Sequence, residues 1–120
     1  MKDFVSKHSD YFYLVFRVII GGIFLLHGIQ KMPGIFNGST DGLMFFAGII
    51  ETIGGIIIIL GLLTRYVAAV TAIEMLVAYF MVHLPMGLSP LMNKGEPALL
   101  FFAAFLVLIA FGAGKYSIDD

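Results

Sequence analysis

Four apolar stretches, each close to the length that crosses a lipid bilayer, fill most of this 120-residue chain. A spanning helix needs about 20 mostly apolar residues, and the stretches cover approximately residues 11–30, 42–63, 66–84 and 97–114. With 60% hydrophobic and 12% charged residues, the chain has too little polar surface to surround four such helices in water. The sequence therefore predicts an all-α, single-domain transmembrane four-helix bundle in contact with the lipid bilayer.

The connections and the basic residues predict how the helices cross the membrane. Only Thr64 and Arg65 separate the second stretch from the third, whereas the other connections are longer and rich in turn-forming residues. Basic residues are more numerous on the side of the two termini, with Lys2, Lys7, Arg65 and Lys115 there against Lys31 and Lys94 on the other. By the positive-inside rule, we expect a multi-pass protein of the inner membrane with both termini on the cytoplasmic side.

Three charged side chains, Arg17, Glu51 and Glu74, lie well inside the predicted helices. Each costs about 2.5–3.5 kcal/mol when it faces lipid, so each should face the interior of the bundle. Glu51 shares its helix face with small residues that allow close helix packing: Ala47, Gly48, Gly54 and Gly55. A guanidinium cannot be neutralised, so Arg17 is expected to form a buried ion pair with Glu51, Glu74 or both. Such a pair could serve function or only fix helix register.

A second polar group collects at the predicted outer ends of the helices. It comprises His27, Lys31, His83, Asn93, Lys94 and Glu96. Either histidine could simply be solvated at the interface, and Glu96 could cap the last helix. On an ideal helix His83 lies about 180° from Glu74, which argues against a cavity shared by the two.

Several short segments carry a resemblance to a known family. They are Arg17, Gly21, His27-Gly28 and Lys31 on the first helix, Glu51, Gly54-Gly55, Gly61 and Thr64-Arg65 on the second, then Asn93-Lys94-Gly95-Glu96 and the tail of residues 112–119. In order and spacing they resemble the DoxX family of small bacterial and archaeal membrane proteins. Lys94 and Ala113 stand where relatives commonly have glycine and proline.

The resemblance implies a four-helix membrane protein. Some members are named as subunits of quinone-linked oxidoreductases that act on sulfur compounds, and others are associated with oxidative-stress complexes. Some more distant relatives use cysteines. This chain contains no cysteine, so any redox role must run through a bound cofactor, a quinone or a partner.

A quinone site needs an apolar slot with hydrogen-bonding or protonatable groups at the carbonyl oxygens. We assign Glu51 and His27 as candidate catalytic residues, with Lys31, His83, Asn93 and Glu96 as candidate ligand-binding residues. Haem is disfavoured, because it would require His27 and His83 to face each other. No metal site is predicted, since no Glu-x-x-His pair occurs on any helix.

The function predicted on these grounds is that of a membrane subunit of a quinone-linked redox or oxidative-stress system, with its site in the outer half of the bundle. Two alternatives stay open: a non-catalytic membrane anchor or assembly factor for a soluble enzyme, and a small proton-coupled transporter that uses Glu51 or Glu74. A soluble oxidoreductase partner and a homo-oligomer are also open. The net charge of −1 gives no reason to expect nucleic acid.

Overall fold

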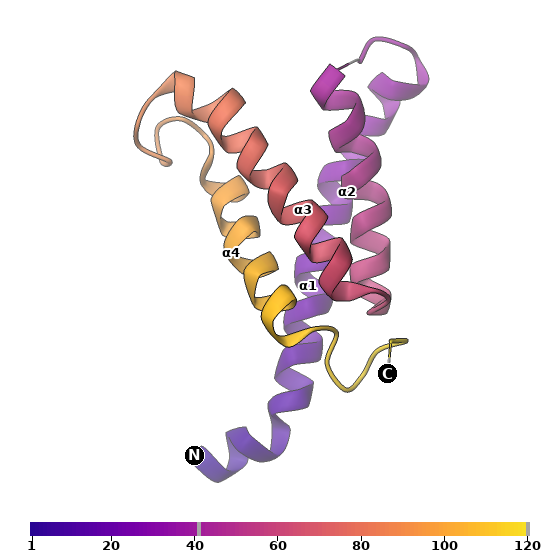
Figure 1. Ribbon diagram of the computed structural model, residues 1–120, viewed down its shortest axis with the longest axis vertical. Helices are drawn as coiled ribbons and strands as arrows, with labels where there is room; N and C mark the ends of the chain where they lie inside the picture. The colour runs from indigo at the N-terminus through magenta and orange to yellow at the C-terminus, as the bar shows by residue number, and fades with distance from the viewer. Residues whose placement is uncertain (41, 120) are drawn as a thin grey trace.

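The computed structural model describes residues 1–40 and 42–119, and within them the chain is 79% helical without strands. The prediction of an all-α fold with four helices is confirmed. The helices are α1 (Lys2–Phe36), α2 (Gly42–Leu60), α3 (Thr64–Ala78), the short π-helix η1 (Tyr79–His83), the 3₁₀ turn η2 (Leu84–Met86) and α4 (Glu96–Phe111). Both ends of the described chain lie toward the lower end of the molecule in Figure 1.

Helix α1 is longer than the predicted stretch of residues 11–30: it begins at Lys2, since its first turns contain no glycine or proline, and it continues through Pro33 to Phe36. Its 35 residues have a helical length of about 52 Å when measured along the helix axis. The hydrocarbon core of a bilayer is only about 30 Å thick, so the polar first turns project beyond the apolar part. Helix α2 ends at Leu60, where Gly61 and Leu63 take positive φ values of 71° and 48° and turn the chain sharply into α3.

The third predicted helix changes its winding near its end. It is α-helical only to Ala78, and continues as η1 and η2. Pro85 has no N–H to donate to the carbonyl of Met81, and its ring crowds that carbonyl. The wider i→i+5 turns of η1 accommodate this conflict.

Three helical segments of the described chain have the length and composition to cross a membrane: Lys2–Phe36, Gly42–Leu60 and Thr64–Met86. The fourth predicted spanning helix forms as α4, but it is shorter, with 16 residues between Glu96 and Phe111. Gly112, with φ 76°, ends it.

Helices α1 and α2 form one closely packed hairpin, and α3 with α4 forms the other (Figure 1). Glycines make the first hairpin tight: a Cβ atom added to Gly55 would lie 2.7 Å from the backbone nitrogen of Leu25, and one on Gly28 would overlap Thr52. The prediction of a small-residue packing face on α2 is thus confirmed, and Glu51 on that face is buried.

An aromatic cluster joins the two hairpins at mid-height. Phe24 of α1 packs edge-on against Phe105 of α4, with ring centroids 4.9 Å apart, and also contacts Phe101 at 5.2 Å. From this cluster the hairpins converge toward the termini and diverge toward the opposite end (Figure 1). We refer to these as the closed end and the open end.

Candidate functional site

At the closed end, the guanidinium of Arg17 donates hydrogen bonds to four backbone carbonyls. It donates to Ile58 O at 3.0 Å and Ile59 O at 3.2 Å in the last turn of α2, and to Ala113 O and Tyr116 O of the tail, the latter at 2.9 Å. The predicted ion pair of Arg17 with Glu51 or Glu74 is therefore wrong. The last carbonyls of a helix lack intrahelical partners and carry partial negative charge, so a buried cation is satisfied there without a carboxylate.

The tail after α4 continues across the closed end and caps α3. The Asp119 carboxylate accepts hydrogen bonds from the backbone N–H groups of Leu63 at 2.6 Å and Thr64 at 3.1 Å. The backbone N–H of Asp119 donates to Gly61 O at 2.9 Å. We call Arg17 together with residues 112–119 the tail clamp. The tail clamp joins α1, the α2–α3 turn and α4. A hollow of about 380 Å³ lies beside it and is bordered by Arg65 and Phe111.

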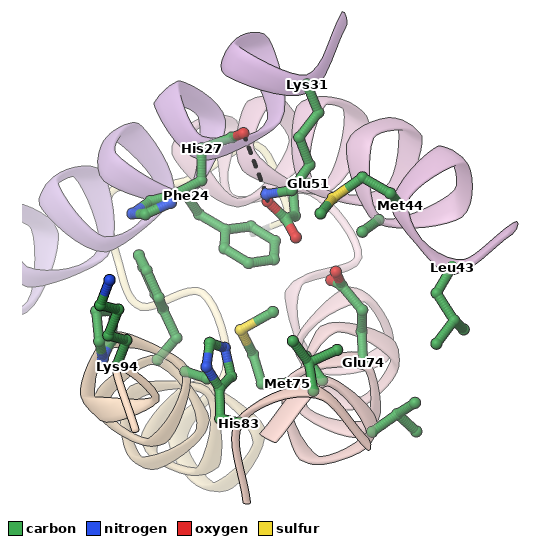
Figure 2. Close-up of a pocket in the computed structure, with 17 residues that line it drawn as sticks. Phe24, His27, Lys31, Leu43, Met44, Glu51, Glu74, Met75, His83 and Lys94 are labelled. Atoms are coloured by element: carbon green, nitrogen blue, oxygen red, sulfur yellow. Dashed lines mark hydrogen bonds and ion pairs between the residues drawn. The ribbon is translucent and has the colours of Figure 1, made fainter. Parts of the chain in front are cut away.

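The open end contains a cavity of about 350 Å³ between the two hairpins, which we call the inter-hairpin pocket. All four α-helices contribute to its lining, which is mainly apolar, with Phe24 and Met75 near its centre (Figure 2). Its volume falls within the range of small-molecule sites, about 300–1,000 Å³. Six of the polar residues singled out from the sequence line the pocket: His27, Lys31, Glu51, Glu74, His83 and Lys94.

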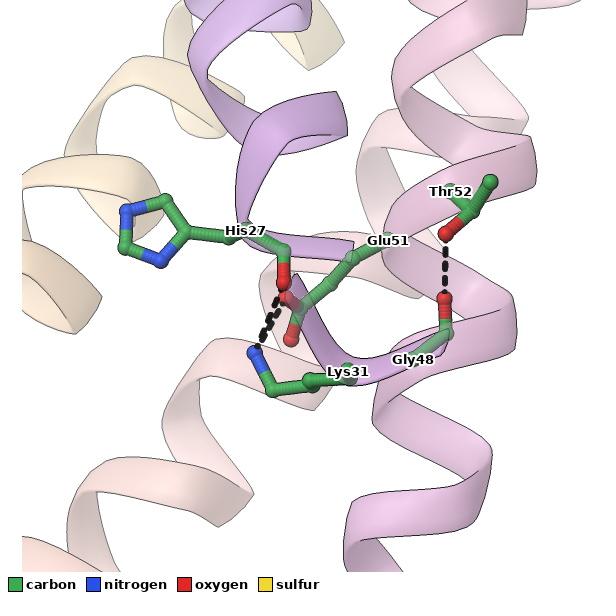
Figure 3. A network of polar contacts seen from close by, with 5 residues as sticks. All are labelled: His27, Lys31, Gly48, Glu51 and Thr52. Carbon is green, nitrogen blue, oxygen red and sulfur yellow. Dashed lines mark hydrogen bonds and ion pairs between the residues drawn. The ribbon is translucent and has the colours of Figure 1, made fainter. Parts of the chain in front are cut away.

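Glu51 forms an ion pair with Lys31 at one side of this pocket. The distance from Lys31 Nζ to Glu51 Oε1 is 2.7 Å, and the same ammonium approaches His27 O at 3.4 Å. The side chains are 22% and 5% exposed, respectively, so the pair is mostly shielded from the surroundings. Beside it, the Thr52 hydroxyl donates to Gly48 O at 2.7 Å, which satisfies the hydroxyl within α2 (Figure 3).

The two histidines line the pocket away from the ion pair. The His27 ring points away from Lys31 and Glu51 (Figure 3) and packs perpendicular to Phe101, with centroids 5.5 Å apart. His83 Nδ1 lies 3.1 Å from Asn93 O. The expectation that His83 and Glu74 do not share a cavity is wrong, because the wider turns of η1 shift His83 around the axis relative to an ideal α-helix. In the sequence, Pro85 was the signal that could have predicted this change of winding.

Asn93 and Glu96, predicted to bind ligand, lie outside the pocket lining. Asn93 is fully buried and organises the α3–α4 connection: its amide donates to Gly87 O at 2.8 Å and to the Tyr79 hydroxyl at 3.3 Å, and its carbonyl accepts from Gly95 N at 2.8 Å. Glu96 is exposed in the first turn of α4, where a carboxylate complements the helix dipole.

Lys94 reaches the pocket from a strained backbone position. Its φ of 62° is one that glycine adopts most easily, which accounts for the glycine expected here from the family pattern. Its side chain lines the pocket on the same side as His27 (Figure 2).

Glu74 is the least satisfied polar group of the site. Both of its carboxyl oxygens are buried and have no hydrogen-bond partner in the part of the chain that the structure describes. The carboxyl group points across the pocket toward Glu51 (Figure 2). Sequence reasoning considered Glu74 as a possible partner of Arg17, which lies at the other end of the molecule, and as a proton carrier only in the transporter alternative.

The described residues contain no group of three histidine, aspartate or glutamate side chains that could hold a metal ion. The polar side chains that line the pocket can form hydrogen bonds and exchange protons. Lys31, Lys94 and the histidines can donate, and the two carboxyls can accept or, when protonated, donate.

Together, the apolar helices and the cavity between the two hairpins define a multi-pass membrane protein whose helix bundle encloses a pocket. The family profile of DoxX matches residues 12–84, and the chain belongs to the DoxX family.

Similar proteins cover nearly the whole chain. An uncharacterized protein of Haemophilus influenzae is 35% identical, covering 97% of this chain and 94% of its own length. The Bacillus subtilis protein named "Putative oxidoreductase CatD" is 32% identical over 96% of this chain and 90% of its own length. An uncharacterized membrane protein of Mycobacterium tuberculosis is 28% identical, over 86% and 76%. No solved structure matches the chain significantly.

Proposed function

We propose that the inter-hairpin pocket binds a quinone, and that this protein is the membrane subunit of a quinone-linked redox or oxidative-stress system. The observation that carries the proposal is the arrangement of polar groups around an apolar centre. Lys94, His27 and His83 lie toward one side of Phe24 and Met75, and Glu51 and Glu74 lie toward the other (Figure 2). A quinone ring has the complementary form, since it is flat and apolar with a carbonyl oxygen at each end.

The position of the pocket also supports a ligand that is dissolved in the bilayer. The hairpins diverge around the pocket, and exposed apolar side chains such as Leu43 and Met44 border it. In a membrane these side chains face lipid, so an isoprenoid tail could extend outward between the hairpins while the ring stays inside. A redox role is supported by the oxidoreductase name of the Bacillus subtilis relative.

The proposal is tested on protein isolated from its native membranes in lipid nanodiscs. Extraction followed by mass spectrometry should recover an isoprenoid quinone in near-stoichiometric amount, and an added short-chain benzoquinone should raise the melting temperature saturably. Bulk lipid from the same membranes is the control for quinone carried over without binding. Quinone at no more than its level in bulk lipid, together with no saturable thermal shift, would contradict the proposal.

A pair of matched substitutions on α2 locates the binding. Ala47 lines the pocket, and Ala47→Phe should fill part of it and abolish the thermal shift. Ile53 is 54% exposed on the same helix, and Ile53→Phe should leave the shift intact. Equal loss in both variants would mean that the quinone binds elsewhere.

The inner membrane, cytoplasmic termini and a soluble oxidoreductase partner belong to the same proposal. The 35-residue α1 places charged groups beyond the apolar span, including Lys2, Asp3 and Lys7, where a soluble protein could bind. Native mass spectrometry should then show a stoichiometric partner. A stoichiometric partner without any bound quinone would favour the anchor or assembly function instead.

A further inference from the structure

Glu74 has an environment that an ionised carboxylate does not tolerate alone. Its two carboxyl oxygens are buried and lack hydrogen-bond partners among the described residues. An isolated charge in an apolar setting is strongly disfavoured, so such a group is either paired, neutral or bound to a ligand. The Lys31 ammonium, drawn against the Glu51 carboxyl in Figure 2, is already bonded to Glu51 at 2.7 Å.

The titratable groups that face the pocket come from several elements. Helix α1 contributes His27 and Lys31, α2 contributes Glu51, η1 contributes His83, and the connection before α4 contributes Lys94. The pocket-lining residues of α4 itself, Pro97, Ala98 and Phe101, are apolar. His27, His83 and Lys94 lie toward the opposite side of the pocket from Glu74 (Figure 2). The local charge around Glu74 is therefore set by Glu51 and Lys31.

The charge balance of these three groups requires one proton. Two carboxylates and one ammonium would leave a net negative charge in an apolar interior, whereas one added proton makes the group neutral. Two carboxyls that face each other at one site hold such a proton jointly, because both cannot ionise easily. Glu51 is fixed by Lys31, so the remaining carboxyl, Glu74, is the one free to turn to a ligand.

We propose that Glu74, Glu51 and Lys31 form a proton-holding triad, and that Glu74 donates its proton in a hydrogen bond to a carbonyl oxygen of the ligand in the inter-hairpin pocket. The role of Glu74 in binding the ligand rests on the proposed quinone function, whereas the presence of a shared proton in the triad does not. This assignment reverses the one made from sequence, in which Glu51 served the ligand. Lys31 and Glu51 act as positioning residues that set the charge state of Glu74.

Infrared spectroscopy of the ligand-free protein in nanodiscs at neutral pH tests the proton. The wild type should show a protonated-carboxyl C=O band that shifts in deuterated water. Glu74→Gln should remove the band, because no second carboxyl then shares the site with Lys31 and Glu51. Glu51→Gln should also remove it, since Lys31 becomes free to pair with an ionised Glu74.

For Lys31→Met we expect a stronger band, whereas the two glutamine variants should lose it. Without the ammonium both carboxyls should be protonated, and the band should grow about twofold. Glu96→Gln, at an exposed carboxylate outside the pocket, is the control and should leave the band unchanged. Size-exclusion chromatography and circular dichroism confirm that each variant is folded. A wild type without the band, or a band that persists in Glu74→Gln, overturns the triad.

A short-chain benzoquinone tests the ligand contact in the same samples. Binding should shift the carboxyl band of the wild type, and Glu74→Leu should weaken quinone binding by about tenfold through loss of one buried hydrogen bond. A band that does not move when quinone is bound contradicts the contact while the proton remains. If no quinone binds at all, the proposed function and the ligand role of Glu74 both fail, and the ligand-free spectra still decide whether the triad holds a proton.

Discussion

The two ends of this bundle use charged residues in opposite ways. At the closed end, Arg17 is 2% exposed and makes hydrogen bonds to four carbonyls, and the Asp119 carboxylate accepts two backbone N–H groups. At the open end, Glu74 has no partner among the described residues and points into a cavity. Saturated polar groups stabilise a fold, whereas an unsatisfied buried group suits a site that awaits a ligand or exchanges a proton.

The difference leads us to expect that substitutions at the closed end affect stability, and that polar substitutions at the open end affect binding. The hairpins are held together below by the tail clamp and at mid-height by Phe24, Phe101 and Phe105. The open end can then keep a cavity without loss of the bundle.

The largest effect should come from Arg17→Met. The substitution removes two buried and two partly buried hydrogen bonds to backbone carbonyls, and we expect the free energy of unfolding in detergent to fall by about 3–5 kcal/mol. Arg17→Lys, which keeps the charge but not the planar fork of donors, should recover only part of this loss. Denaturant titration followed by circular dichroism measures both. An unchanged stability of Arg17→Met would remove the basis for the comparison between the two ends.

The next largest effect concerns the α1–α2 seam, on which both ends depend. Gly55→Ala should cost about 1–3 kcal/mol, because its Cβ would lie 2.7 Å from the Leu25 nitrogen. Gly22→Ala is the matched control: beyond the backbone of its own helix turn and its chain neighbours, no atom lies within 4 Å of its Cβ position, and a glycine inside a helix is replaced favourably by alanine. Similar thermal stabilities for the two variants would show that the helices do not pack as described.

The cap on α3 should contribute less. Asp119→Ala removes the acceptor of the Leu63 and Thr64 N–H groups, and we expect a loss of about 1 kcal/mol. Asp10→Ala, at an exposed position on α1, should have little effect under the same denaturation. Equal stabilities of the two variants would mean that the Asp119 side chain contributes nothing to the tail clamp.

The smallest effect on stability is expected for Glu74→Gln. The substitution keeps the size of the side chain and removes a carboxyl without hydrogen-bond partners, so the free energy of unfolding should change by no more than about 0.5 kcal/mol. An ion pair of Glu74 with Arg17, one of the pairings that the sequence left open, leads to the opposite expectation. A loss comparable with that of Arg17→Met would show that Glu74 has a structural role.

Much of the fold was predictable, because it follows from hydropathy and small residues. Apolar stretches located the helices, and the glycines around Glu51 identified the packing face of α2. The observed helix bounds differed from the predicted ones where single residues determined them. One example is Pro85, whose missing N–H and bulky ring accompany the change to π-helical turns.

The candidate site was less predictable, because sequence reasoning considered only charged side chains as partners for other charged side chains. The partners of Arg17 are main-chain carbonyls at a helix end and in a tail about a hundred residues away in sequence, which side-chain patterns do not show. Whether Lys31 pairs with Glu51 or Glu74 depends on helix rotation and rotamers rather than on spacing. Asn93 was noted as a polar residue of interest, but its hydrogen bonds all serve the α3–α4 connection.

Photoaffinity labelling with an azido-quinone tests most directly whether the open end is the binding site. Peptide mass spectrometry of the protein in nanodiscs should place saturable labels on pocket-lining residues such as Met75 and Met44. The labels should be lost in Ala47→Phe and kept in Ile53→Phe. Labels that survive Ala47→Phe, or that fall on the closed-end hollow beside Arg65 and Phe111, would contradict the account.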